Sequence, residues 1–596
     1  MTCSSWTKKS TNAQAIEMAQ NSSRNPSIPD SPSIPDSLGS KDVTVQTSNV
    51  ATPTNSAGPT ILREEDCEDK LGFAFSQAKK WTILTTIFAV QSSMNFNASV
   101  YGNAVAPMTA KFGVSPQMGR IGQMAFLIAY AFGCELWAPW SEELGRKPVL
   151  QWSLGLVNMW QIPCALISTY VSPPSGIART TTDNYHRFAP GHSQIAVPAI
   201  IVFRTLGGLS SAGGSVTLGM VADMWKSDEP AYGVAFVVFS SVLGSIFGPV
   251  VGGFLQHYLS LASIFWAQLI FGVVVQFAHF WIVPETRSSC IVTAEAKRQR
   301  KQGHKVVSEA EHANEKVTFK FACRIWARPF VMFLCEPIVL LLSLISGFAD
   351  ALIFTFLDSM GLVFDQWHFN PWQTGLIFIS LAIGYMIAYA IWCSIIYRQS
   401  KKPKSYLESL PIENKLTWLV WIAPLLVIGI FGFAFTGIGP PIHWIVPVLF
   451  LIPIGIANMT IYGSTIDYMV VAYGEKYSAS ACGGNGFARD FLAGVAAMYA
   501  HPLYTNGALF GKTPAQKMRN ASCLLGAIAV ILIGPIYFFW KKGEWVRSKS
   551  RFAKEVEETR QKKEATLPQH NGSTGVDCGR NQGMKQKSSS LVNVPL

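Results

Sequence analysis

Charge is scarce in this 596-residue chain, because only 14% of its residues are Asp, Glu, Lys or Arg while 49% are hydrophobic. Soluble domains carry about 25% charged residues. The deficit is concentrated in apolar blocks that recur between Trp81 and Trp540. Several blocks have roughly 18 or more nearly uncharged residues, enough to cross a ~30 Å hydrocarbon core as a helix. The composition excludes an ordinary soluble protein and predicts an all-α membrane protein.

Familiar catalytic and metal-binding patterns are also missing. The eleven cysteines include no C-x-x-C pair, so their spacing defines neither a metal centre nor a disulfide framework. The chain has no P-loop, no H-E-x-x-H motif and no convincing Ser/His/Asp arrangement, so nothing supports ATP-driven transport or hydrolysis. We therefore expect no enzyme activity, no cofactor and no metal site.

Positive charge is in excess, with a net charge of +12, but the basic residues fall in connections and tails. That distribution favours orientation in a membrane over binding of nucleic acid. The chain does not begin with a charged-then-apolar signal peptide, so the first span is expected to act as an uncleaved signal.

The apolar blocks divide the chain into two halves of six spans. We expect a disordered cytosolic tail at 1–78, a six-helix half at 79–285, a basic cytosolic linker at 286–328, a second six-helix half at 329–541 and a disordered cytosolic tail at 542–596. The twelve expected spans are 82–103, 118–138, 148–170, 196–219, 232–256, 262–283, 333–357, 373–395, 416–437, 442–464, 480–501 and 521–540.

Lys and Arg follow spans two, four, six, eight and twelve, whereas the connections after spans five, seven and nine have none. This asymmetry predicts that both termini are cytosolic, and the plasma membrane is the default location. The long connection at 171–195 is either an extracellular loop or an artefact of gene-model translation. Asn520 begins a sequon on the expected outer side and is a glycosylation candidate.

Two local strings place charge and turn chemistry at particular depths. In "WAPWSEELGRKPVL" (Trp137–Leu150), Gly145 permits a tight turn, and Arg146 and Lys147 hold the loop at the cytosolic face. A plain positive-inside loop would show the same residues. In "FRTLGGLSSAGGS" (Phe203–Ser215), Arg204 is near mid-membrane, where a charge is costly and faces a cavity or a partner. A structural ion pair between helices is the alternative.

A third string, "GSIFGPVVGG" (Gly244–Gly253), concentrates helix-breaking residues in an apolar segment. Gly244, Gly248 and Gly252 share one helix face and let another helix approach closely, and Pro249 adds a bend there. A generic small-residue contact is the alternative.

Together with "VPETR", "EPIVLLLSL", "IHWIVP" and "SASACGGNGFARDF", these strings resemble the major facilitator superfamily, and within it the fungal twelve-span drug:proton antiporter branch. The resemblance covers about 80–545 without 171–195 and implies the twelve-helix major facilitator fold. The chain differs from the usual pattern of that branch at Cys134-Glu135, at Glu229-Pro230-Ala231 and in the phenylalanines of span seven.

The resemblance also implies roles. In the family, the acid at Glu142 caps a facing helix of the other half and Arg146 pairs with the acid that ends span four. The implied loop signature is Ser141, Glu142, Gly145, Arg146, Lys147 and Asp223, and the implied antiporter signature is Gly244, Gly248, Pro249, Gly252 and Gly253.

Proton coupling requires a group that titrates inside the membrane. The candidate carboxylates are Glu135, Asp350 and Asp467, and we expect Arg204 to pair with Glu135 or Asp350 as the proton-coupling element. Polar or aromatic groups within apolar spans are the substrate-cavity candidates, although ordinary helix packing accounts for any one of them: Asn95, Asn97, Tyr101, Gln161, Phe354, Asn458, Tyr462 and Asn485.

The sequence therefore predicts a monomeric, proton-coupled exporter of small amphipathic organic molecules such as drugs, toxins or secondary metabolites. Its expected partners are a small-molecule substrate, protons and the lipid bilayer. A polyamine exporter is the nearest alternative, and a transporter-like sensor that moves no cargo is a more distant one.

Overall fold

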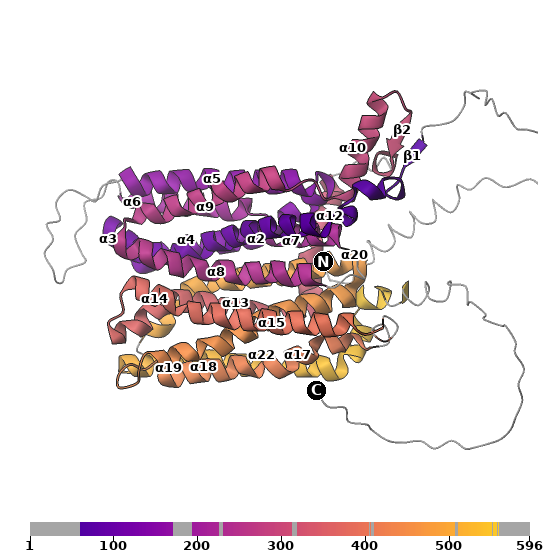
Figure 1. The fold of residues 1–596 in the computed structure, drawn as a ribbon. Helices are drawn as coiled ribbons and strands as arrows, with labels where there is room; N and C mark the ends of the chain where they lie inside the picture. The colour runs from indigo at the N-terminus through magenta and orange to yellow at the C-terminus, as the bar shows by residue number, and fades with distance from the viewer. Residues whose placement is uncertain are drawn as a thin grey trace, which may run out of the picture.

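A computed structural model describes residues 60–170, 193–225, 231–312, 319–403, 406, 410–506, 511–550, 552–556 and 558–559. Most of the long 171–195 connection lies outside these residues. The helices run side by side in one bundle (Figure 1). We call the end that carries α10 (Ser288–Lys301) the linker end, and the opposite end, which carries α3 (Val105–Phe112), the far end.

The first half contains six spans that alternate in direction. They are α2 (Gln77–Ser99) with η3 (Val100–Ala104), α4 (Pro116–Glu143), α5 (Arg146–Tyr170), α6 (Ser193–Ser210) with α7 (Gly213–Met224), α8 (Tyr232–Tyr258) and α9 (Leu261–Ile282).

The second half repeats this arrangement with more interruptions. Its helices are α12 (Phe319–Cys335), α13 (Pro337–Phe364), η4 (Asp365–Trp367), α14 (Pro371–Ile377), α15 (Ile379–Ser400), η5 (Ile412–Leu416), α17 (Thr417–Ile422), α18 (Pro424–Thr436), α19 (Ile445–Leu449), α20 (Leu451–Thr505) and α22 (Pro514–Lys549). The 55-residue α20 contains two spans, because Gly474 breaks the helix with φ 54° and ψ −172°.

Eight helical segments of the described residues are long and apolar enough to cross a membrane. Four more helical stretches bring the number to the expected twelve: α2, α5, α6 with α7, and the part of α20 after Gly474. These four have more polar residues, since they contain Arg204, Arg489 and the buried amides described below.

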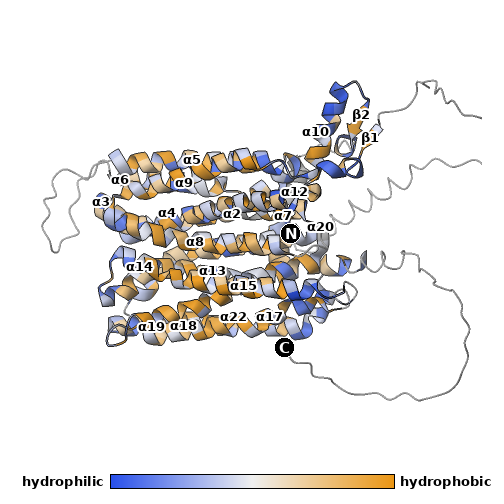
Figure 2. Cartoon of the chain, in the orientation of Figure 1, coloured by the Kyte–Doolittle hydropathy of each residue, from blue (hydrophilic) through white to orange (hydrophobic). Residues whose placement is uncertain are grey.

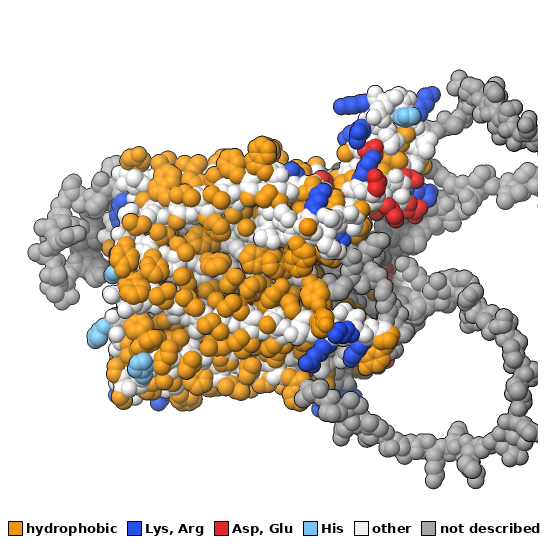
Figure 3. Space-filling model, viewed as in Figure 1, with side chains coloured by type: hydrophobic (Ala, Val, Ile, Leu, Met, Phe, Trp, Pro, Cys, Tyr) orange, Lys and Arg blue, Asp and Glu red, His pale blue; other side chains and the backbone are white. Residues whose placement is uncertain are grey.

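The outside of the bundle is apolar. On α9, Ile270, Val274, Phe277 and Trp281 lie on one face and are 60–79% exposed. Figure 2 shows hydrophobic residues along the lengths of the helices, and Figure 3 shows them covering the visible side while Lys and Arg gather mainly at the linker end. In water this surface would cost ~25 cal/mol per Å², so the expected surroundings are lipid.

The end of the predicted N-terminal tail is folded, which corrects the expectation of disorder for residues 60–76. Strand β1 (Thr60–Leu62) pairs in parallel with β2 (Val306–Ser308) of the linker. The ion pair Lys70–Glu295 (3.0 Å) joins the same two segments and holds the pKa of Glu295 below its usual range. The reason for the order is a small apolar cluster that neither segment forms alone: Leu62, Cys67, Leu71, Val292, Ala296 and Val306.

The second tail also begins later than expected. Helix α22 continues to Lys549, beyond the predicted boundary at 541. Arg547 forms an ion pair with Glu413, which holds this extension against η5. Asn520, the glycosylation candidate, is half-buried within α22. Its modification stays a prediction.

Candidate transport site between the two halves

The two halves meet mainly through α4 against α20 and α8 against α14. Glycines make this contact close, because a Cβ added to Gly494 would lie 2.9 Å from Ile128, and one added to Gly253 would lie 2.6 Å from the carbonyl oxygen of Pro371. Phe126 and Phe354, the latter a cavity candidate, pack in one buried cluster that joins the halves. The helices around this interface carry the buried charges.

In the second half, Arg489 of α20 and Asp350 of α13 form an ion pair at 3.0 Å, and each side chain is at least nine-tenths buried. The guanidinium of Arg489 lies 3.4 Å from the ring centroid of Tyr462. Asn458 donates to the carbonyl oxygen of Ala349 at 2.8 Å, beside Asp350. Asn485 donates to Thr465 at 3.1 Å. Three cavity candidates, Asn458, Tyr462 and Asn485, therefore lie on the helices that form this ion pair.

In the first half, Arg204 of α6 is fully buried. It donates to the carbonyl oxygen of Asn97 at 2.8 Å and to Gln268 at 3.2 Å. Its guanidinium also lies 4.0 Å from the ring of Phe126 and 4.7 Å from that of Tyr101. These groups compensate the charge, and no carboxylate among the described residues forms an ion pair with Arg204.

The expected pairing of Arg204 with Glu135 or Asp350 is therefore wrong for this structure. Asp350 belongs to the other half and is held by Arg489. Among the cavity candidates, Gln161 donates to Asn97 at 3.4 Å near Arg204, whereas Asn95 donates to the carbonyl oxygen of Gln91 within its own helix.

Glu135 of α4 has a different environment. The residue is 5% exposed, and a Cβ added to Gly483 of α20 would lie 2.9 Å from its carboxyl carbon. Within the described part of the chain, its carboxyl group makes no hydrogen bond or ion pair. Glu135 is thus a buried carboxyl group at the interface with no fixed cation.

The far end of the interface is closed by a second buried ion pair. Arg120 of α4 lies 3.8 Å from Asp358 of α13, and the side chains are 9% and 2% exposed. Gln123 is fully buried. Five polar atoms of this group have no hydrogen-bond partner among the residues that the structure describes: Arg120 Nε and Nη1, Gln123 Nε2 and Oε1, and Asp358 Oδ2. The pair joins the halves but is poorly satisfied.

At the linker end, aromatic rings of the two halves contact each other instead. Phe132 of α4 lies 5.1 Å from Phe487 of α20 and 5.7 Å from Phe330 of α12, measured between ring centroids. Trp140 and Trp326 make a similar contact at 6.2 Å. Both ends of the interface therefore have contacts between the halves.

The turn between α4 and α5 brings the loop signature together. Arg146 contacts Asp223 of α7 at 3.0 Å, and its guanidinium also donates to Ser141 at 2.6 Å. Gly145 adopts φ 101°, which favours glycine. Glu142, expected to cap a helix of the other half, is instead 46% exposed and lies 3.9 Å from Arg146.

The acid that caps a helix here is Glu285, which was not among the residues predicted from the sequence. Its two carboxylate oxygens accept hydrogen bonds from the backbone amides of Arg146 and Lys147, at 2.9 and 3.2 Å. An anion at this position satisfies unpaired amides and complements the helix dipole.

The glycines of α8 pack as their spacing predicts, and the partner is α2 with η3. Added Cβ atoms would lie 2.8 Å from the backbone of Ser92 for Gly244, 2.6 Å from the amide nitrogen of Val100 for Gly248 and 2.7 Å from the side-chain carbon of Asn103 for Gly252. The carbonyl of Pro249 faces Gly375 of α14. Helix α8 thus contacts both halves.

The sequence profile described as "Major Facilitator Superfamily" matches residues 87–498. This chain belongs to the Major Facilitator Superfamily. It is therefore a membrane-embedded transporter protein with the twelve-span fold of that family, and the family's members are not enzymes.

Fungal relatives support this assignment. The transporter paaT of Penicillium rubens is 27% identical over 516 residues, which cover 85% of this chain and 86% of paaT. The "MFS-type transporter acdC" of Aspergillus candidus is 25% identical, over a match that covers 80% of this chain and 87% of acdC. The "Efflux pump atB" of Aspergillus terreus is 28% identical, over a match that covers 70% of this chain and 81% of atB.

Solved structures agree on the fold. The proton:xylose symporter XylE aligns with a TM-score of 0.52 at 15% identity, covering 78% of this chain and 96% of XylE. At this identity the likeness concerns the superfamily fold alone.

Three charged residues of the candidate site were not selected from the sequence: Arg489, Arg120 and Asp358. A signal was present for Arg489, because "FARDF" places two adjacent charges, Arg489 and Asp490, inside an expected span. Arg120 and Asp358 lie at or just beyond the expected span ends, where charge is ordinary, and only the packing of α4 against α13 buries them.

Proposed function

We propose that this protein is a proton-coupled exporter of small amphipathic organic molecules, such as drugs, toxins or secondary metabolites. In this proposal the linker end is cytosolic, both termini are cytosolic and the membrane is the plasma membrane. The basic residues of the connections support that orientation. The relative atB is an efflux pump by name, which supports the outward direction.

The observation that carries the proposal is the environment of Glu135. A carboxyl group buried at the interface without a cation can take up or release a proton without breaking an ion pair. Its position against Gly483 of the opposite half means that rocking of the halves would change its exposure. This combination is what antiport requires: one group that meets protons in one state and is shielded in the other.

The remaining groups have supporting roles in the proposal. Arg489–Asp350 forms the polar part of a mostly apolar site beside Phe354, and Arg204 stiffens the first half. Arg120–Asp358 and the aromatic cluster close the two ends. The close packing of α8 against α2 and α14 supports its implied antiporter role.

A transport assay tests the function. The full chain is expressed in a yeast strain without its major efflux pumps, and retention of preloaded rhodamine 6G, radiolabelled spermidine and a panel of fungal metabolites is measured with and without a protonophore. We expect export of at least one amphipathic compound that the protonophore abolishes. Export that persists with the protonophore contradicts proton coupling.

The same assay separates the alternatives. Export of spermidine alone would favour a polyamine exporter, and binding without export of any compound would favour a sensor. Glu135→Gln should abolish protonophore-sensitive export while expression stays normal. Glu544→Gln, on an exposed carboxylate of the α22 extension, is the matched control and should export like the parent.

A further inference from the structure

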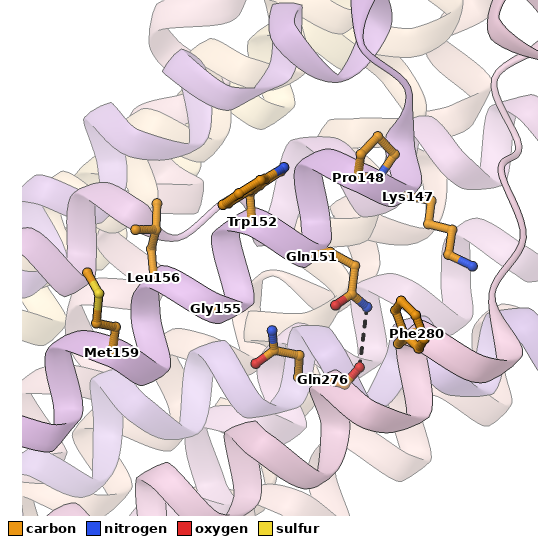
Figure 4. A pocket seen from close by; sticks show the side chains of 9 residues that line it. All are labelled: Lys147, Pro148, Gln151, Trp152, Gly155, Leu156, Met159, Gln276 and Phe280. Carbon is orange, nitrogen blue, oxygen red and sulfur yellow. Dashed lines mark hydrogen bonds between the residues drawn. The ribbon is translucent and has the colours of Figure 1, made fainter.

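A groove of about 610 Å³ lies between α5 and α9 on the outside of the first half (Figure 4). It exists because Gly155 has no side chain: a Cβ added there would lie 3.2 Å from Nε2 of Gln276, with no other atom nearby. Trp152 and Met159 of α5 and Phe280 of α9 form apolar walls that are 69%, 43% and 53% exposed. Lipid is the solvent at this surface.

The length of the groove matches one leaflet. Lys147 and Met159 line its two ends, and twelve residues of helix separate them by ~18 Å. Half of the hydrocarbon core is ~15 Å thick. One acyl chain that lies along α5 would therefore run from the membrane boundary to about the midplane.

The mouth of the groove carries the ammonium group of Lys147. The ammonium of Lys147 lies 5.5 Å from the ring centroid of Phe280, and among the described residues no carboxylate lies within ion-pair distance of it. The neighbouring Arg146 differs, since Asp223 and Glu142 both contact it. The Glu285 carboxylate near Lys147 is occupied with backbone amides.

The two polar side chains that line the floor, Gln151 and Gln276, in contrast, both make hydrogen bonds within the protein. Gln151 donates to the carbonyl oxygen of Gln276 at 3.3 Å, as Figure 4 shows. Asn158 donates to the side-chain oxygen of Gln276 at 2.8 Å. The parts of the groove that remain for a ligand to contact are therefore the apolar walls and the ammonium group of Lys147.

We propose that this groove is a binding site for an anionic phospholipid of the leaflet at the linker end. The phosphate contacts the ammonium of Lys147, and one acyl chain lies along α5 between Trp152 and Met159. A free anion would match the cation but leave the apolar walls uncovered, and a lipid without net charge would match only the walls.

A lipid bound at this site would lie next to the ion-pair network of the turn between α4 and α5. Lys147 directly follows Arg146, and the Glu285 carboxylate accepts hydrogen bonds from the backbone amides of both residues. A headgroup on Lys147 is thus one residue from the network that joins α4, α5 and α7. This inference does not depend on the cargo or the direction of transport.

The first test measures headgroup selectivity on the purified full chain in detergent. Phosphatidylserine and phosphatidylcholine with identical acyl chains are titrated, and bound lipid is counted by native mass spectrometry. We expect about fivefold preference for phosphatidylserine, which corresponds to ~1 kcal/mol for one basic residue that faces an anionic lipid. Lys147→Gln should remove the preference. Lys401→Gln, which removes a lysine stacked on Tyr397 at the same end of the bundle, should retain it.

The second test addresses the acyl chain. Phosphatidylserine with brominated chains should quench tryptophan fluorescence, and Trp152→Phe should remove part of the quenching. Gly155→Leu fills the groove and should lower phosphatidylserine binding as much as Lys147→Gln does. Glycerophosphoserine and inorganic phosphate should not compete. Competition by either anion, equal binding of the two lipids, or full selectivity in Lys147→Gln would overturn the proposal.

Discussion

Arg489 and Asp350 hold each other at 3.0 Å in the interior of the second half, with Tyr462 stacked on the guanidinium. Both side chains are at least nine-tenths buried. A buried pair of this kind contributes little net stability, but the loss of one member leaves a charge uncompensated.

Asp350→Asn should therefore destabilise the protein by ~3–5 kcal/mol and should abolish transport. Thermal unfolding in detergent and the export assay measure the two effects. The double variant Asp350→Leu with Arg489→Met removes both charges and should regain most of the stability without regaining transport. A single variant as stable as the parent would contradict the buried-pair interpretation.

Arg120 and Asp358 form the weaker pair at the far end, at 3.8 Å with several unsatisfied atoms. Asp358→Asn should loosen this end, because it removes the attraction between the halves. Gly102 is a suitable reporter position, since an added Cβ would lie 3.8 Å from Gln123 and 4.0 Å from Asp358.

In a background without other accessible cysteines, Gly102→Cys should react several-fold faster with a membrane-impermeant maleimide when Asp358→Asn is present. The charge swap Arg120→Asp with Asp358→Arg should restore slow labelling. Equal rates in all backgrounds would show that the pair does not close the far end.

Gly248 allows α8 to approach α2. Gly248→Ala should destabilise by ~1–3 kcal/mol, because the added methyl group meets the backbone of Val100 and cannot be accommodated by a side-chain rotation. Gly486→Ala is the matched control: it is also inside a helix, no atom lies within 4 Å of its added Cβ, and its expected effect is neutral or slightly stabilising. Thermal unfolding of both variants decides the comparison.

Asp223 joins two cations at the linker end, Arg146 at 3.0 Å and Arg287 at 3.6 Å. Asp223→Asn should lower stability by ~1–3 kcal/mol, since it leaves these guanidinium groups without their shared acid. Glu142→Gln should change stability by less than ~0.5 kcal/mol, because that carboxylate is half exposed. If the two variants behaved alike in thermal unfolding, burial would not be the deciding factor.

Much of the fold follows from hydropathy alone. Twelve apolar blocks, a basic linker and glycines every four residues in α8 are patterns of sequence, and the helices and the packing of α8 agree with them. The folded segment at 60–76 was missed because its apolar residues are too few to pack by themselves. They become a cluster only with residues more than 200 positions away.

In the charged site, too, the sequence indicated one part of the answer and the packing of the helices decided the other. The sequence alone predicted that Arg204, Glu135 and Asp350 lie in membrane spans, because each lies in an apolar block. The tertiary structure decided their partners: Arg204 is compensated by carbonyl oxygens and rings, Asp350 by Arg489, and Glu135 by no described residue. Depth in the membrane depends on local composition, whereas charge compensation depends on which helices pack together.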